Sequence, residues 1–443
     1  MLILSVSSTE PFRTMILRWI ATLLVALLLA APAHALPDVP PDSSDTPDAP
    51  PAATEGDASI DPLPGSWPEA RSAVTRHADD YVGLDDAAAV YEQESLVYRT
   101  PPAFRYNRAE GLVVGLQREP LSLDSEDEAR LYGQLGYATA LRDMRYTVGL
   151  ESRLYRENAM ALKVGVAYQK QTIAPDRWKT SWAENSGVGI GFEYDFFDYY
   201  EAEGVTAYAM QTLPATLRLT AGFRSEDHRT LAKNTDWSVV ETGRFRPNPA
   251  VDEGRLEAVF ASLTGGTIRD REDLPSGAAF RVSVEHGSAL GDASAYTRVE
   301  GDARGFLRLT TDTRLGLRVR GGSVTSNAPL QKQFTLGGIG SVRSFEQNAF
   351  RGANTFLANA EYIIDGATVF DDVLDDLFVT AFADAGWVGA PGERFRTEDV
   401  LPSAGFGIGL DERSVRLDVS WPLRDVPGAD SGPSLWLRFT PTF

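Results

Sequence analysis

The feature that most constrains this chain is an alternation of apolar and polar side chains that recurs from Tyr106 to the end of the sequence. In one segment, Leu315, Leu317 and Val319 alternate with a glycine and three arginines. Successive side chains of a β-strand point to opposite faces, so each such segment predicts a strand with one apolar face. About sixteen segments of roughly ten residues show the pattern, an even number and the length that a tilted transmembrane strand requires.

Soluble β-sandwiches also alternate, so the pattern alone leaves two architectures open. Here short turns alternate with long loops at residues 170–185, 225–251 and 323–353, which is typical of a barrel with one short-turn rim. Closure also satisfies every backbone polar group of a sheet in lipid. We therefore predict an all-β fold over residues 106–443, a sixteen-stranded antiparallel transmembrane β-barrel whose long loop between strands eleven and twelve folds inward.

The residues before this region predict export and a spacer. Residues 1–35 are typical of a secretory signal peptide, with an apolar run, a small-residue cleavage site and an expected start at Met15. Residues 36–65 carry seven acidic residues, no basic residue and eight prolines, which predicts a disordered linker. Residues 66–105 predict a short, partly helical segment. After the signal peptide, no segment reaches the roughly 18 apolar residues of a transmembrane helix.

Composition excludes several classes of function. The formal net charge of −20 argues against a nucleic-acid partner, whose binding surface must be basic. The chain has no cysteine, which excludes disulfides, thiolate metal sites and cysteine nucleophiles. Past the signal peptide, histidine occurs only at His77, His228 and His286, and the sequence contains neither G-x-S-x-G nor H-E-x-x-H. We therefore predict no catalytic residue, metal or cofactor; an outer-membrane hydrolase that uses His228 or His286 is the least favoured hypothesis.

Three local patterns lead to further expectations. Residues 186–191 alternate glycine with apolar residues and predict a strand, whereas His228 falls in a charged segment that predicts a solvated loop. Four acidic residues lie around four aromatic residues in one short segment: Asp195, Asp198, Glu201 and Glu203. They predict an acidic turn beside an aromatic girdle, in preference to a calcium site built from oxygen ligands.

Two motifs carry the candidate site. The first, Val342-Arg343-Ser344-Phe345, lies in the glycine-rich loop after predicted strand eleven, and the second, Phe382-x-Asp384-x-Gly386, lies on predicted strand thirteen. The odd-numbered residues of strand thirteen form a continuous apolar face, so the second motif points into the lumen. Glu361 on strand twelve points the same way. An inward loop would bring the Arg343 guanidinium to Asp384 and Glu361 in a charge-assisted pair.

These motifs resemble those of the superfamily that contains BamA-like assembly factors and ShlB/FhaC-type two-partner secretion transporters of the haemolysin secretion and activation type. The resemblance spans residues 106–443. It implies that the loop arginine locks onto the strand-thirteen aspartate, and that the protein works in the bacterial outer membrane on a polypeptide client. The chain departs from the family in two ways: Ser344 replaces a glycine, and no complete POTRA domain fits between the predicted cleavage site and Tyr106.

The final strand also resembles the sorting signal of bacterial outer-membrane proteins, because it places Phe439 and Phe443 on one face. The expected partners are therefore the outer-membrane lipid bilayer, the barrel assembly machinery that would insert the chain, and a secreted or inserted polypeptide. The leading hypothesis is protein translocation or insertion at the outer membrane. The alternative is a passive pore or structural barrel that handles no client.

Overall fold

The computed structural model describes residues 96–439, with gaps at 98, 124–128, 158, 215, 241–243, 272–273, 311, 326, 366–376, 411–414, 428 and 430–431. The chain divides into two units, residues 1–68 and 69–443, and all described residues belong to the second. The predicted signal peptide, the acidic linker, residues 66–95 of the predicted partly helical segment and Phe443 lie outside the described residues.

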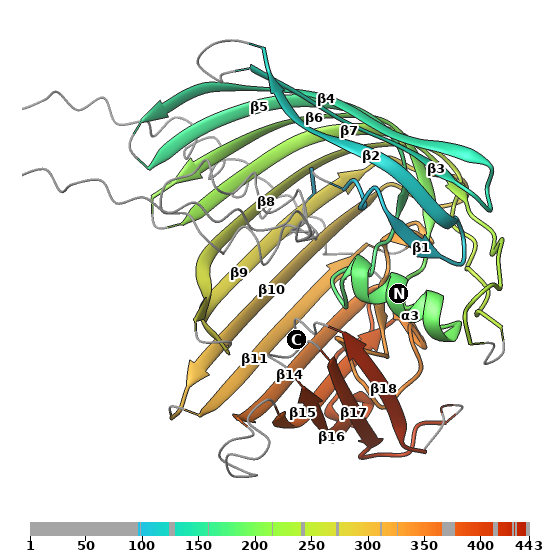
Figure 1. Ribbon diagram of the computed structural model, residues 1–443, viewed down its shortest axis with the longest axis vertical. Coiled ribbons are helices and arrows are strands. Elements are labelled where there is room, and N and C mark those ends of the chain that lie inside the picture. The colour runs from blue at the N-terminus through green and yellow to red at the C-terminus, as the bar shows by residue number, and fades with distance from the viewer. Residues whose placement is uncertain are drawn as a thin grey trace, which may run out of the picture. The chain divides into compact units, whose positions relative to one another are not determined.

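Sixteen strands form one sheet in which each strand pairs antiparallel with its neighbours in sequence, and β11 pairs with β14 across the longest loop. This confirms the predicted all-β, sixteen-stranded fold. Figure 1 shows the strands following one another around a curved sheet, whose concave side we call the lumen. The strands of this sheet are β1 (Arg105–Asn107), β2 (Gly111–Ser122), β3 (Ala129–Ala138), β4 (Asp143–Glu157), β5 (Met160–Ile173), β6 (Tyr200–Leu213), β7 (Leu217–Thr230), β8 (Gly254–Arg271), β9 (Leu274–Gly287), β10 (Tyr296–Arg308), β11 (Thr313–Val324), β14 (Asn354–Asp365), β15 (Leu377–Gly389), β16 (Leu401–Leu410), β17 (Val415–Pro422) and β18 (Ser434–Phe439).

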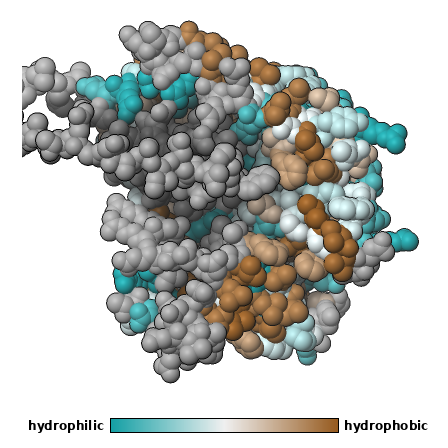
Figure 2. All heavy atoms as spheres, viewed as in Figure 1, coloured by the Kyte–Doolittle hydropathy of each residue, from teal (hydrophilic) through white to brown (hydrophobic). Residues whose placement is uncertain are grey.

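The alternation along the strands buries polar groups and exposes apolar ones. On β17 and β18, Arg416 and Arg438 are 0% exposed, whereas Leu417 is 38% and Leu435 64% exposed. A soluble sandwich would show the reverse, because its apolar faces form the core. Figure 2 shows hydrophobic side chains gathered over the C-terminal strands, in the lower half of the view. The pattern fits a barrel with a polar interior and an apolar exterior.

The remaining elements lie in the loops. Helix α3 (Trp182–Phe192) follows β5, the short strands β12 (Phe334–Leu336) and β13 (Phe350–Gly352) pair within the loop after β11, and η2 (Leu330–Lys332) and η4 (Thr397–Asp399) are single 3₁₀ turns. Among the described residues, no helix has both the length and the apolarity needed to cross a membrane.

The strand predicted over residues 186–191 is wrong, because these residues belong to α3. Ser181 caps the helix by accepting a hydrogen bond from the backbone N–H of Glu184 at 3.0 Å. A serine at this position is a helix-start signal, but the alternation of glycines that follows it favours a strand. The strand count still holds, because β5 pairs directly with β6 and the three-residue β1 adds a strand at the end of the sheet, beside β2.

The expected solvated loop at His228 is also wrong. His228 lies in β7, is fully buried, and packs against the ring of Tyr200 with ring centroids 4.7 Å apart. His286 lies on β9 with an exposed side chain and sits 2.9 Å from the hydroxyl of Thr297. The two histidines therefore lie apart from each other, one in the lumen and one outside it.

The aromatic residues near Asp195 do not form a girdle, which corrects the third local expectation. Phe196, Phe197 and Tyr199 are buried in a cluster with Trp182 of α3 and residues of the other long loops. The acidic residues between them are buried with them. In the part of the chain that the structure describes, no group of histidine and carboxylate side chains is arranged to hold a metal ion.

Candidate functional site

Arg343 lies at the centre of a buried charge cluster in the lumen. Its Nε and Nη2 atoms donate to the two carboxylate oxygens of Asp384 at 2.9 and 2.7 Å, and its Nη1 donates to Glu361 Oε1 at 2.5 Å. Its guanidinium carbon lies 3.5 Å from the ring centroid of Phe382. The structure thus brings together the loop arginine, both acids and the aromatic residue that the two sequence motifs supplied.

Strand register fixes the receiving side of this pocket. In the β14–β15 ladder Asn359 lies opposite Asp384, and Glu361 lies opposite Phe382, so all four side chains share the lumen face. Asn359 donates from one amide nitrogen to Asp384 Oδ1 and to the backbone oxygen of Ser341, each at 2.8 Å. The hydroxyl of Ser403 on β16 lies 3.2 Å from Asp384 Oδ2. The Asp384 carboxylate, on β15, is therefore also held by neutral donors on β14 and β16.

A second arginine continues the cluster toward the C-terminus. Arg416 on β17 donates to both oxygens of Glu361 at 3.2 Å and to Asp418 at 2.8 Å. Asp418 also lies 3.7 Å from Arg343. Two guanidinium groups therefore face three carboxylates, each acid touching at least one arginine. Burial alone would lower the pKa of Arg343, but the neighbouring carboxylates outweigh it and raise the pKa above its ordinary value, so Arg343 stays charged.

The flanking motif residues fill the space beside the charges. Val342 is fully buried in an apolar cluster with Leu336 and Phe345, and Phe345 packs edge-on against Phe350 with ring centroids 5.3 Å apart. Ser344 is not among the residues of positive φ in the described chain. Serine therefore needs no left-handed backbone here, and the departure from the family's glycine causes no strain of that kind.

Gly386 leaves room for Val342 to pack directly on β15. A Cβ at this position would lie 2.6 Å from Val342 Cγ2 and 2.9 Å from Leu336 Cδ1. We expect Gly386→Ala to lower the free energy of unfolding by about 1–3 kcal/mol, since one side must shift. Urea unfolding followed by tryptophan fluorescence measures this. Gly301→Ala on β10 is the control, because its Cβ meets open space; equal effects of both changes would mean that the loop does not pack on β15.

The last strand, β18, binds the backbone of the Arg343 loop through two side chains. Trp436 on β18 donates from its indole nitrogen to the backbone oxygen of Arg343 at 2.6 Å. The hydroxyl of Ser434 lies 3.0 Å from the backbone oxygen of Ser344. The same loop tip is therefore fixed to β14, β15 and β18. Phe439, half-buried at the end of β18, packs against the loop cluster, and its role in sorting stays a prediction.

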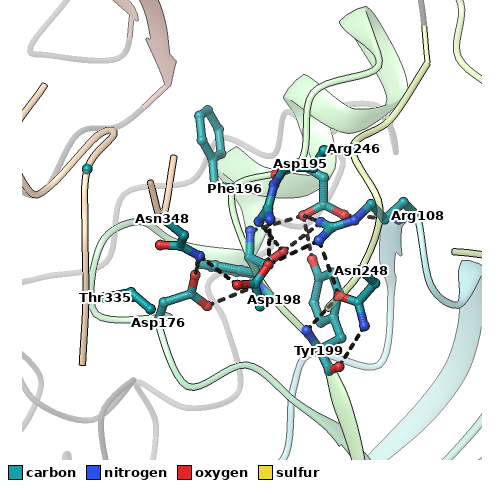
Figure 3. Close-up of polar contacts among 12 residues, drawn as sticks. Arg108, Asp176, Asp195, Phe196, Asp198, Tyr199, Arg246, Asn248, Thr335 and Asn348 are labelled. Carbon is teal, nitrogen blue, oxygen red and sulfur yellow. Dashed lines mark hydrogen bonds and ion pairs between the residues drawn. The ribbon is translucent and has the colours of Figure 1, made fainter. Parts of the chain in front are cut away.

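The long loops are joined to one another by a second buried polar network, which we call the rim network (Figure 3). Asn348, from the loop after β11, donates to Asp176 at 2.6 Å and to Asp198 at 3.0 Å, both in the loop between β5 and β6. Asp198 also accepts from Arg246 in the loop after β7 at 2.5 Å and from Arg108 in the β1–β2 turn at 3.2 Å. Four connections on one rim of the sheet therefore meet at a single carboxylate.

Burial shifts the pKa values of two groups in the rim network. Burial and the nearby charge of Asp198 raise the pKa of Asp176 to about 6. Burial lowers the pKa of Lys179 to about 8, against the attraction of the two aspartates. Lys179 Nζ donates to Gly337 O at 3.2 Å and to Asn348 Oδ1 at 2.5 Å, which adds a further link between the two longest loops.

Several residues of the site escaped the sequence analysis. Arg416 and Asp418 occupy the polar phase of an alternating strand, which marks them as lumen-facing but does not single them out. Asn348 and Lys179 lie in loops with no periodicity, 169 residues apart in sequence. Only the fold shows that they meet.

Comparisons with known proteins bear on the family of the chain. The protein-family comparison matches residues 154–433 to the Omp85 superfamily domain. A search of curated protein sequences found no match. Among solved structures, BamA from Haemophilus ducreyi lacking POTRA domains 1-3 is similar with 13% identity and a TM-score of 0.47, covering 76% of this chain and 69% of that chain. CdiB from Acinetobacter baumannii is similar with 11% identity and a TM-score of 0.40, covering 75% and 57% respectively.

The family match covers more than half of the chain and includes the Arg343 loop together with β14 and β15, whose acidic residues bind Arg343. The protein belongs to the Omp85 superfamily.

Proposed function

We propose that this protein translocates or inserts polypeptides at the bacterial outer membrane, in the manner of ShlB/FhaC-type secretion and activation barrels, and that it does so without enzymatic catalysis. The observation that carries the proposal is the Arg343 cluster within an Omp85 superfamily barrel. Its proposed partners are the lipid bilayer, a polypeptide client and the machinery that assembles the barrel. The predicted signal peptide and C-terminal sorting signal belong to this proposal.

In this proposal the cluster sets the state of the lumen. The loop after β11 stays in the lumen while Arg343 is paired. If the Arg343 guanidinium left the cluster, Asp384 and Glu361 would remain buried without its positive charge, which costs free energy. Loop movement therefore requires a compensating change, such as the arrival of a polypeptide segment that supplies other partners. A passive pore that stays open would not need a loop held in its lumen by buried ion pairs.

Planar-bilayer recording tests the proposal. The purified protein should show rare, flickering openings, whereas a passive pore shows large steady conductance. We expect Asp384→Asn to raise the frequency of openings about tenfold, because a neutral amide gives up the charge-assisted bonds to Arg343. Glu398→Gln is the control, since that carboxylate lies in an exposed ion pair.

A second experiment addresses the client. The protein is co-expressed with a large secreted β-helical protein of the kind that two-partner secretion barrels export, and release of that protein from the cell is measured. Release that depends on the barrel supports the proposal. Steady conductance in bilayers together with no released client would instead identify a passive pore.

A further inference from the structure

The two ends of the sixteen-stranded sheet, β1 and β18, are its two terminal strands in sheet order. Among the described residues no backbone ladder joins them, so each presents an open edge to the other. Open strand edges are templates for pairing with another extended chain, and proteins cover them with helices, loops or charges. We call the junction between β1 and β18 the seam. Helix α3 contacts both strands there (Figure 1).

Side chains of α3 bind backbone groups of both edges. The backbone N–H of Phe439 on β18 donates to Glu184 Oε1 at 3.0 Å, and Arg438 Nε donates to the same oxygen at 2.8 Å. On the other side, the backbone N–H of Tyr106 on β1 donates to Ser186 Oγ at 3.0 Å. These are donors that a paired strand would otherwise engage. The helix therefore stands where a strand partner would stand.

The Glu184 contact is fully shielded. Glu184 is 1% exposed and Arg438 0% exposed, so their ion pair is little screened by solvent. Glu184 also accepts the hydroxyl hydrogen of Thr180, within the same loop. Loss of the carboxylate charge would deprive the buried Arg438 guanidinium of this ion pair.

The helix itself is weak. Three glycines, Gly187, Gly189 and Gly191, occupy its second half. At Gly187 and Gly191 a Cβ would meet open space, so packing does not require glycine there. Each interior glycine disfavours a helix about fivefold relative to alanine. Helix α3 therefore depends on its contacts with the seam and with the loop after β7, where Val239 N donates to Ile190 O at 2.7 Å.

From these contacts we propose that α3 is a releasable clasp that closes the seam. Glu184 and Ser186 are its positioning residues, and the helix must leave before the edge of β1 or β18 can pair with another polypeptide strand. This proposal rests on the proposed function, because releasing a strand edge matters only if a client polypeptide pairs with that edge. The clasp also explains the two glycines of α3 that packing does not require, Gly187 and Gly191. They lower the helix propensity of the segment, and a weaker helix is released more easily.

The test uses the absence of cysteine in the full chain, which makes a single introduced thiol an unambiguous reporter. Ala109, in the β1–β2 turn, is 0% exposed and shares a buried cluster with Trp182 and Val188 of α3. Its modification rate as Ala109→Cys, with a membrane-impermeant maleimide, reports how often α3 leaves. Ala258→Cys, buried in a separate cluster, is the control reporter.

The proposal predicts changes in opposite directions. Adding Glu184→Gln should raise the labelling rate at position 109 about tenfold, because a charge-assisted contact is lost. Adding Gly187→Ala should lower it about fivefold by strengthening the helix. Neither change should alter labelling at position 258. A response at both reporters, or at neither, would overturn the clasp.

Two further measurements keep the outcomes distinct. If Glu184→Gln does not fold, Ser186→Ala replaces it. This change removes the contact to Tyr106 and is expected to speed labelling severalfold, although alanine favours the helix more than serine does; no change then counts against the clasp. Labelling needs no client. A clasp that responds as expected in a protein that exports nothing would overturn the proposed function, whereas export with an unresponsive seam would overturn only the clasp.

Discussion

Replacing Arg343 with alanine is expected to lower the free energy of unfolding by about 3–5 kcal/mol. The side chain is 2% exposed and makes charge-assisted bonds to Asp384 and Glu361. Alanine removes the guanidinium and leaves both acids buried, with Glu361 keeping Arg416 and Asp384 keeping the neutral donors Asn359 and Ser403. The desolvation cost of the stranded charge accounts for most of the loss. Urea unfolding in detergent micelles, followed by tryptophan fluorescence, measures it.

Two controls show whether the effect comes from the cluster. Arg396→Ala removes an arginine whose ion pair with Glu398 is 68% and 73% exposed, and should change stability by about 0.5 kcal/mol or less. Arg343→Ala combined with Asp384→Ala should cost less than the sum of the single changes, because no unpaired acid remains at that position. Additive losses would show that Arg343 stabilises the protein through packing on Phe382 instead of through charge.

The core of this cluster could be predicted from sequence because strand geometry fixes it. Once β15 is recognised by its apolar phase, the opposite phase places Asp384 and Gly386 in the lumen without further information. Arg343 follows from a different source, the resemblance of its motif to a known family. The physical reason for the paired motifs emerges only in three dimensions: Val342 needs Gly386, and Arg343 needs both Asp384 and Phe382.

Where the structure departs from the sequence pattern, tertiary contacts override the local preference of the residues. Residues 186–191 alternate like a strand, yet they form a helix because Ser181 caps it and the loop cluster holds it. Asp198 looks like part of an exposed acidic turn, yet Arg108 and Arg246 neutralise it inside the rim network. Periodicity reports which face a strand presents, but it carries no information on which distant loop will cover a residue.

The rim network also predicts the effect of a substitution at an uncharged residue that packs against its Lys179. Gly340 has a φ of +64°, and a Cβ there would lie 2.2 Å from the backbone oxygen of Lys179 and 2.7 Å from its Cα. Alanine must therefore adopt a left-handed backbone and push apart two loop backbones. We expect Gly340→Ala to lower the free energy of unfolding by about 2–4 kcal/mol, the sum of a conformational cost and overpacking. Urea unfolding again provides the measurement.

A matched glycine separates these two costs. Gly392 has a φ of +78°, but a Cβ added there would have no neighbour within 4 Å, so Gly392→Ala should show the backbone cost alone, about 1 kcal/mol. The excess at Gly340 then measures how firmly the loop after β11 rests on the loop before α3. Because that contact also positions Lys179 toward Asn348, Gly340→Ala should in addition raise the frequency of channel openings. Equal losses at both glycines would mean that the loop after β11 does not rest on the loop before α3 at Lys179.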